Sequence, residues 1–165
     1  MADTITYSYE SDDFFTIMCY NRISGRGGYK MTVIFCLDDN RGMLFNNRRL
    51  SRDAMVFEDI KTYLKGSLLI NEFSEKLVSA SGLNYEVFKN FVTKPDFETI
   101  YYIENISVKE HLDKIDRIIV YWWNRKYPSD TKLDFDPLDC GYKPTSVYEF
   151  VGKSHEKITR EIFER

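Results

Sequence analysis

Short runs of β-branched and aromatic residues alternate along this chain with segments in which apolar residues recur at helical spacing. The runs predict strands at residues 14–20, Met31–Leu37, Leu68–Ile70, 98–106, 118–123 and 147–151. Helical spacing predicts helices between Ser51 and Gly66, over Glu72–Ser79, after Asn84 and over residues 154–163. This alternation favours an α/β fold with a mixed β-sheet flanked by helices over a sandwich or a helix bundle.

One stretch in the second half of the chain is locally ambiguous. Residues 108–122 also fit one continuous helix, but residues 118–123 are so rich in β-branched and aromatic side chains that a strand is favoured. Ser107 and Glu110 have the spacing of a capping box, so a helical turn is expected to begin there. We therefore expect a short helical segment followed by a strand.

The length of the chain fits one domain, so residues 1–165 are expected to fold as a single unit. Residues 1–12 contain acids and no Lys or Arg, which is the opposite of a secretory signal, and they are expected to form a flexible acidic segment. The apolar runs are far shorter than the roughly 18 residues that a membrane span requires. A soluble cytoplasmic protein is expected.

The cysteines and histidines lack the spacing of a metal site. Cys19, Cys36 and Cys140 form no closely spaced pair, and the first two lie in strand-like runs, where a thiol acts as a small apolar side chain. His111 and His155 are far apart and have no Cys or carboxylate at metal-ligand spacing. No metal site is expected.

Ser154 beside His155 could supply a nucleophile and its base. Adjacent residues rarely face each other productively, however, and a Ser before a helix-spaced segment is typical of an N-cap. We expect Ser154 to cap the last helix, with Ile158, Ile162 and Phe163 packed on the core.

A basic group precedes the first predicted helix. Arg48, Arg49 and Arg52 lie just ahead of Asp53, and a helix N-terminus favours a bound anion. The alternative is a solvated basic face with an ion pair to Asp53. Glycines at residues 25–28 lack the Lys-Ser/Thr pair of a phosphate-binding loop, so they favour a hairpin turn.

Aromatic residues cluster near the middle of the second half of the chain. Trp122 and Tyr127, with basic neighbours, have the composition of a platform on which single-stranded nucleic acid stacks. In a strand, however, Trp122 would face one side of the sheet and Tyr121 and Trp123 the other, so core packing is favoured. The acids that follow would also repel a phosphate backbone.

Residues 130–139, which we call the acidic segment, carry four acids against one lysine, with apolar residues between them. This pattern is typical of a protein interface in which apolar side chains anchor the contact and acids steer a basic partner such as a nuclease. It lacks the central Gly and terminal Glu of a calcium-binding EF-hand loop. The residues expected to contact a partner are Tyr127, Asp130, Asp134, Phe135, Asp136 and Asp139.

Residues 42–53, 121–130 and 152–159 resemble a bacterial family of immunity proteins against contact-dependent growth inhibition ribonuclease toxins. The resemblance spans most of the chain. It implies a non-catalytic cytoplasmic protein that binds one cognate toxin domain in a one-to-one complex and neutralises it. It implies neither a cofactor nor contact with a membrane or with nucleic acid.

A second similarity concerns the fold. Residues 33–47, a strand followed by an acidic-Asn-Gly loop, and Asp53 at the start of a helix are similar to the opening of dihydrofolate reductases. The similarity implies a reductase-like scaffold in which Asp53 matches the active-site acid. Residues 70–72 depart from that family, because Ile-Asn-Glu has no Gly-Arg pair to bind a cofactor phosphate, and no Gly-Gly follows a later strand.

A reductase-like scaffold reused for protein binding reconciles the two resemblances, because a fold does not fix a function. We therefore expect a toxin-binding immunity protein. One alternative is a small nucleotide- or folate-binding protein that uses Asp53 and the three nearby arginines. Another alternative is a single-stranded nucleic-acid binding module.

Overall fold

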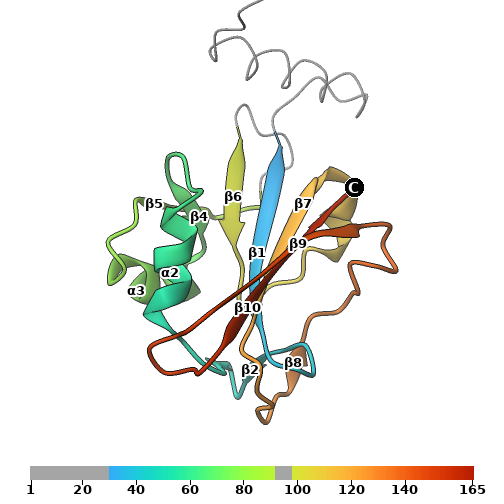
Figure 1. Ribbon diagram of the computed structural model, residues 1–165. Helices are drawn as coiled ribbons and strands as arrows, with labels where there is room; N and C mark the ends of the chain where they lie inside the picture. The colour runs from blue at the N-terminus through green and yellow to red at the C-terminus, as the bar shows by residue number, and fades with distance from the viewer. Residues whose placement is uncertain (1–29, 92–97) are drawn as a thin grey trace, which may run out of the picture.

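A seven-stranded mixed β-sheet organises the molecule (Figure 1). The computed structural model describes residues 30–91 and 98–165. The sheet has the order β5-β4-β6-β1-β7-β10-β9, and β2, β3 and β8 form a small second sheet. The strands are β1 (Met31–Leu37), β2 (Gly42–Phe45), β3 (Arg48–Arg49), β4 (Leu68–Ile70), β5 (Tyr85–Val87), β6 (Thr99–Tyr102), β7 (Arg117–Trp122), β8 (Thr131–Lys132), β9 (Lys143–Phe150) and β10 (Ile158–Glu164).

The five strands β5, β4, β6, β1 and β7 run parallel, whereas β10 pairs antiparallel with both β7 and β9. The helices are α2 (Ala54–Lys61), α3 (Glu72–Ser79) and the 3₁₀ helix η1 (Lys109–Lys114). The predicted α/β class, a mixed sheet flanked by helices in one domain, is confirmed. The predicted strand at residues 14–20, the turn at 25–28, Cys19 and the acidic residues 1–12 lie outside the described residues.

The central strand β1 is covered on both faces, which explains its continuous apolar sequence. Ile34 packs with Val56 and Ile60 of α2, and we call this side of the sheet the α2 face. Val33 and Phe35 point to the opposite face and belong to a second apolar cluster. The alternation of side chains along one strand thus supplies both halves of the core.

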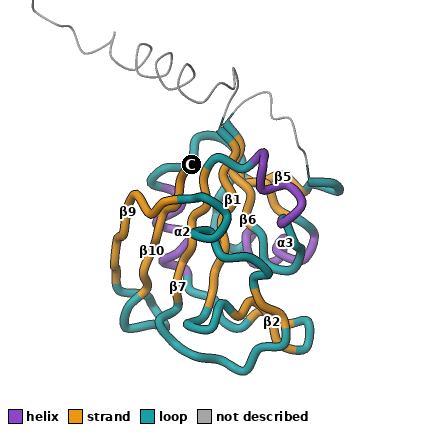
Figure 2. Tube along the Cα trace, turned by 90° about the vertical axis from the view of Figure 1, so that its right-hand side faces the viewer, coloured by secondary structure: helices purple, strands orange, loops and turns teal. Residues whose placement is uncertain are grey.

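Connecting loops gather at the end of the sheet where β1 and β7 finish, near β2 (Figure 2). We call this end the carboxyl end, because the parallel strands finish there. The loops are tied together across long sequence distances: the Tyr127 N–H donates to Asp38, and the Ser154 N–H donates to Asp53. This end of an open α/β sheet is where ligands commonly bind.

Two predicted helices are strands in the structure. Residues 84–91 were expected to be helical, but β5 forms because Tyr85 pairs with Leu68 of β4. A helix was also expected over residues 154–163, but Ile158–Glu164 forms β10, which pairs with both β7 and β9. Sheet pairing with distant neighbours overrides the local spacing in both cases.

The favoured strand at 118–123 is confirmed as β7, and the expected helical turn near Ser107 is η1. The Ser107 hydroxyl accepts a hydrogen bond from the Lys109 N–H at 3.2 Å. The helix predicted to begin after Ser51 is α2, which begins at Ala54 with Asp53 as its N-cap. Among the described residues, no helix is long and apolar enough to cross a membrane.

Candidate functional site

Asp53 is the buried centre of the carboxyl end. It caps α2, and its Oδ1 accepts hydrogen bonds from the Met55 N–H at 3.0 Å and the Lys153 N–H at 2.9 Å. Its Oδ2 accepts from the Ser154 N–H at 2.8 Å, the Ser154 hydroxyl at 3.0 Å and His155 Nδ1 at 3.1 Å. A carboxylate has about four lone-pair positions, so these five bonds leave no capacity for a substrate.

These contacts keep Asp53 ionised. Burial raises the pKa of the carboxyl, but the N–H groups of Lys153, Ser154 and Met55 and the side chain of His155 outweigh it and hold the pKa well below its ordinary value. A general acid or base needs a pKa near the working pH. The environment of Asp53 therefore suits an internal anchor for the loop at residues 152–155.

His155 joins Asp53 to two hydroxyl groups. Its Nε2 lies 3.1 Å from the Ser51 Oγ and 3.2 Å from the Tyr127 hydroxyl. A carboxylate can only accept, so Nδ1 donates to Asp53, and Nε2 is the ring atom that contacts the two hydroxyl groups. The order acid, imidazole, serine hydroxyl is that of a hydrolase triad.

The surroundings of His155 enclose it. The ring stacks on Trp123 with centroids 4.7 Å apart, and only 3% of His155 is exposed. We call Ser51, Asp53, Tyr127, Ser154 and His155 the Asp53 cluster. The predicted role of Ser154 as a helix cap is wrong, because β10 follows it and its hydroxyl binds Asp53. The cluster links the start of α2 to the loops before β8 and β10.

The space between α2 and the sheet is filled by aromatic side chains. Phe57 packs against Tyr102 with ring centroids 5.5 Å apart. Tyr121 is fully buried, and its hydroxyl donates to Asp59 Oδ2 at 2.7 Å and lies 2.8 Å from the Tyr63 hydroxyl. Burial raises the pKa of Tyr121 above its ordinary value, so this phenol stays protonated.

The three arginines near Asp53 do not converge on an anion site. Arg49 forms a bidentate pair with the buried carboxylate of Glu104, at 2.9 Å and 3.0 Å. Burial lowers the pKa of Arg49, but Glu104 outweighs it and raises that pKa. Arg48 and Arg52 are exposed, and they belong to β3 and to the loop before α2, respectively. The cluster expected from the sequence is divided between an internal ion pair and the surface.

Two buried acids at this end were not singled out by the sequence. Asp38 follows β1, and its carboxylate accepts from the N–H groups of Gly42 and Tyr127 at 2.6 Å and 2.9 Å. Glu104 follows β6 and also accepts from the Ser74 hydroxyl at 2.6 Å. An acid within two residues of the end of a largely apolar and aromatic strand was the available signal, since such a residue lies at the carboxyl end of the sheet.

The acidic segment is placed partly as expected. Asp130, Asp134 and Asp139 are exposed. Asp136 is half-buried, and its Oδ2 accepts from Arg41 Nη1 at 3.2 Å. Asp130 accepts from the Asn46 N–H at 2.8 Å. The segment is thereby fixed to the β2 region while several carboxylates face solvent.

The two expected aromatic anchors are less accessible. Phe135 is only 6% exposed and packs edge-on against Phe35, with centroids 6.0 Å apart. It belongs to the core, so its assignment as a surface anchor is corrected. Tyr127 is half-buried and directs its hydroxyl to His155. Leu138, which is 56% exposed, is the large apolar side chain that the segment presents to solvent.

The aromatic residues of β7 do not form an exposed platform. Tyr121 and Trp123 are buried on the α2 face, in the cluster that contains Ile34. Trp122 is half-buried on the opposite face, and its Nε1 donates to Glu161 Oε2 at 3.0 Å. Core packing, the favoured interpretation of the sequence, describes the two buried rings.

The residues at the usual phosphate positions of such a sheet do not suit an anionic cofactor. The first turn of α3 carries Glu72 and Glu75, which oppose the favourable field of the helix N-terminus. Glu104 and Asn105 follow β6, with no glycine to let a phosphate approach the backbone. Within the described ranges, no group of three His, Cys, Asp or Glu side chains is placed to hold a metal ion.

Comparison with known proteins supports the fold. No protein-family profile and no curated protein matches the sequence. Among solved structures, dihydrofolate reductase from Enterococcus faecalis, complexed with NADP(H) and RAB-propyl, is similar with a TM-score of 0.58. The similarity covers 82% of this chain and 96% of that chain at 10% sequence identity. The reductase-like scaffold expected from residues 33–53 is confirmed, and at this identity the similarity concerns the fold alone.

Proposed function

We propose that this protein is an immunity protein that binds a contact-dependent growth inhibition ribonuclease toxin in the cytoplasm. It forms a one-to-one complex with the toxin domain and blocks it without catalysis. The resemblance of residues 42–53, 121–130 and 152–159 to such immunity proteins supports this proposal. The reductase-like scaffold is compatible with it, because a fold can host unrelated functions.

The observation that carries the proposal is the saturation of Asp53. In a reductase-like enzyme, the acid at this position would need free hydrogen-bonding capacity toward a substrate. Here the carboxylate accepts five hydrogen bonds from its own chain, and aromatic side chains fill the neighbouring space. These features favour a binding protein over an enzyme that uses Asp53.

The acidic segment supplies the contact surface. Asp130, Asp134 and Asp139 give exposed negative charge, and Leu138 gives an apolar contact beside them. A ribonuclease presents cations to bind the phosphates of RNA, so it is attracted to an acidic surface. Charged residues of this kind mainly raise the rate of association and its dependence on salt.

The first experiment is co-purification of this protein with the toxin domain encoded directly upstream of its gene. An RNA-degradation assay with that domain then compares cleavage with and without this protein. The proposal predicts a stable one-to-one complex that abolishes cleavage. Absence of a complex, or cleavage that continues within a complex, contradicts it.

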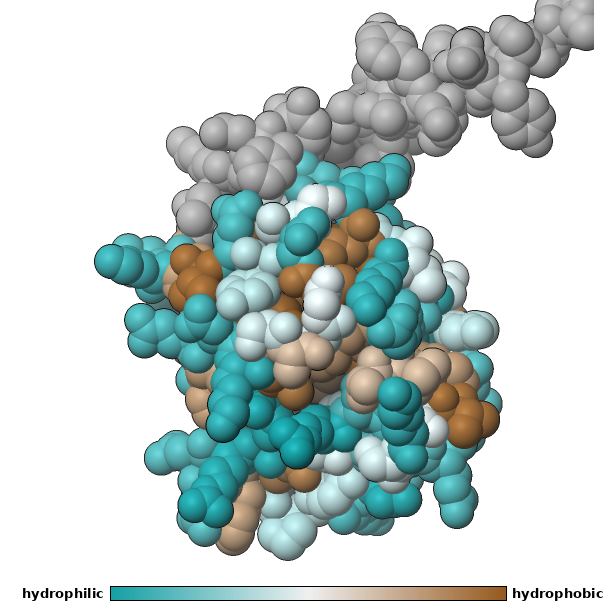
Figure 3. Space-filling model, turned by 90° about the vertical axis from the view of Figure 1, so that its left-hand side faces the viewer, coloured by the Kyte–Doolittle hydropathy of each residue, from teal (hydrophilic) through white to brown (hydrophobic). Residues whose placement is uncertain are grey.

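A charge-reversal pair tests the surface. Asp134→Lys with Asp139→Lys is expected to slow association about tenfold at low salt, because it removes the steering charge. The matched control is Glu75→Lys with Glu86→Lys, which makes the same charge change on α3 and β5. Those elements lie on the side shown in Figure 3, where hydrophilic residues surround small apolar patches. Equal effects of both pairs would exclude the acidic segment as the contact surface.

A further inference from the structure

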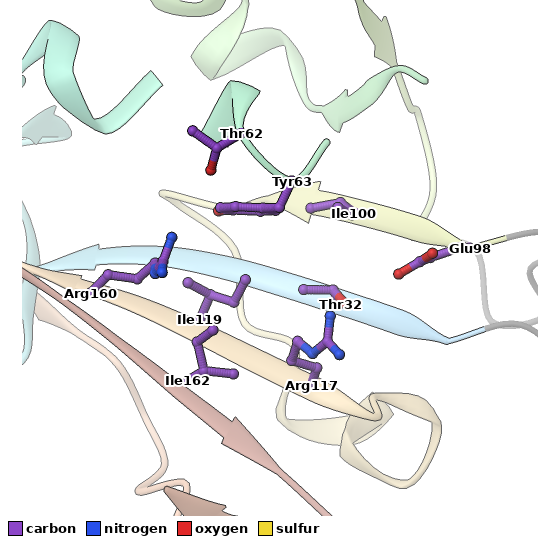
Figure 4. Close-up of a pocket in the computed structure, with 9 residues that line it drawn as sticks. All are labelled: Thr32, Thr62, Tyr63, Glu98, Ile100, Arg117, Ile119, Arg160 and Ile162. Carbon is purple, nitrogen blue, oxygen red and sulfur yellow. The ribbon is translucent and has the colours of Figure 1, made fainter. Parts of the chain in front are cut away.

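A pocket of about 210 Å³ opens on the α2 face and extends from Thr32 and Arg117, at the amino ends of β1 and β7, to Arg160 of β10. Its floor is apolar and consists of Ile100 of β6, Ile119 of β7 and Ile162 of β10 (Figure 4). The ring of Tyr63, just after α2, forms part of a wall. This volume is large enough for a small organic molecule.

The lining contains two arginines and one acid, and each arginine also pairs with an acid outside the lining. Arg117 and Arg160 lie toward different ends of the pocket, and Glu98 is the acid of the lining (Figure 4). Arg160 Nη1 donates to Asp59 at 2.8 Å, and Arg117 Nε donates to Glu164 at 2.7 Å. A guanidinium has five N–H donors, so each arginine keeps donors beyond these pairs.

Two polar atoms of the lining are buried without a hydrogen-bond partner among the described residues. One is Thr32 Oγ1, on a side chain that is fully buried, and the other is Arg160 Nε. Figure 4 shows Thr32 on the floor beside Arg117. A buried polar group without a partner is disfavoured, and native structures keep few of them. Two such groups beside one pocket leave hydrogen-bonding capacity that a bound polar molecule can satisfy.

We propose that this pocket binds a small organic carboxylate with a flat apolar body and a second polar group opposite the carboxylate. The N–H donors that Arg117 and Arg160 keep beyond their ion pairs favour a carboxylate as the acceptor. The isoleucine floor and the Tyr63 ring select a flat apolar body. Arg160 and Thr32 lie at different places along the pocket, so a ligand that contacts both carries a polar group at each end. This binding is independent of the toxin-binding surface.

The experiment titrates the full chain with 4-hydroxybenzoate, followed by ¹⁵N chemical shifts and by melting temperature. 4-Hydroxybenzamide is the neutral probe of matched shape. The proposal predicts that 4-hydroxybenzoate shifts the amide signals of β1, β7 and β10 around the pocket and raises the melting temperature. It also predicts that the benzamide binds at least about tenfold more weakly, since it cannot pair with an arginine as an ion.

Thr32→Val is the diagnostic variant. It removes a buried hydroxyl without a partner and keeps the shape, so the free protein is expected to melt at a higher temperature. Affinity for 4-hydroxybenzoate is expected to fall about tenfold, as befits one lost hydrogen bond. Stability and binding therefore move in opposite directions.

Thr99→Val is the matched control. Thr99 also has a buried hydroxyl with no partner in the described part of the chain. It does not line the pocket, and its strand position faces the opposite side of the sheet from Ile100. This variant is expected to melt at a higher temperature and to bind as the wild type does. Absence of 4-hydroxybenzoate binding to the wild type, or equal affinity of the Thr32→Val and Thr99→Val variants, would overturn the proposal.

Discussion

The two ends of the sheet differ in how completely their polar groups are paired. At the carboxyl end, Asp53, Asp38 and Glu104 each accept hydrogen bonds from the chain itself. At the amino end, Thr32 Oγ1 is buried without a hydrogen-bond partner among the described residues. The end of an open α/β sheet at which ligands commonly bind can thus be closed by the chain's own loops, while a pocket remains on another part of the sheet.

The closing of the carboxyl end follows from one loop. Gly152 lets the chain pass so close to Asp53 that an added Cβ would lie 2.5 Å from its Oδ2. The N–H groups of Lys153 and Ser154 then point at the carboxylate. We therefore expect this end of the sheet to act as a structural anchor.

The largest effect is expected from Asp53→Asn. The change removes a buried charge that accepts five hydrogen bonds. It also places an amide N–H₂ group, which is a donor, against the donors that surround Asp53. The free energy of unfolding should therefore fall by about 3–5 kcal/mol. Urea denaturation measures the loss. Asp139→Asn, at an exposed acid, is the control and should stay within about 0.5 kcal/mol of the wild type. Similar small losses for both variants would contradict the anchor role.

Gly152→Ala is expected to have the next largest effect. The new methyl group would collide with the Asp53 carboxylate and approach the His155 carbonyl oxygen at 3.0 Å. Overpacking of this kind costs about 1–3 kcal/mol. Urea denaturation again provides the measurement, with Lys153→Ala as the exposed neighbour that should change little. A neutral Gly152→Ala would show that the loop does not sit tightly on Asp53.

Acid should weaken the wild type more steeply than Asp53→Asn. Because the pKa of Asp53 is lowered on folding from 3.8, the unfolded state binds its proton first. The stabilisation is complete above that ordinary value and is lost as the pH falls below it, by up to about 1.4 kcal/mol per pH unit. Urea midpoints at several pH values between 5 and 2 test this. Parallel curves for both proteins would be inconsistent with a strongly lowered pKa.

The smallest effect is expected at Ser51. The hydroxyl groups of Ser51 and Tyr127 both contact His155 Nε2. Because the contact with Tyr127 remains in Ser51→Ala, the free energy of unfolding should fall by only about 0.5–1 kcal/mol. A fluorophosphonate probe, which labels activated serines, should leave the wild-type protein unmodified because His155 is enclosed. Labelling that Ser51→Ala abolishes would mean that the triad-like order is catalytic.

Local sequence predicted the elements whose residue pattern fits only one kind of secondary structure or strongly favours it. β1 and β7 are largely apolar runs rich in β-branched and aromatic residues, and Glu72–Ser79 has clear helical spacing. β10 was missed because Ile158 and Ile162 are spaced for a helix turn and equally for one face of a strand. The distant partners β7 and β9 decide between the two.

The candidate site was only partly predictable for the same reason. A helix start placed Asp53, but its partners Lys153, Ser154 and His155 lie about one hundred residues away in the sequence. Phe135 sits between acids in the sequence, yet packing on Phe35 turns it into the core. Which side chains stay free to bind is a property of tertiary contacts that residue order does not contain.

We propose that the end of the sheet at Asp53 is closed to ligands and that the chain is a binding protein. A titration with NADPH and dihydrofolate tests this most directly, with the melting temperature as the readout. Since a ligand that binds the folded state stabilises it by mass action, about 1 mM of either compound would raise the melting temperature of an open site. Our account predicts no shift with either compound alone or with both. A rise that Asp53→Asn abolishes would contradict it and identify a working reductase-like site.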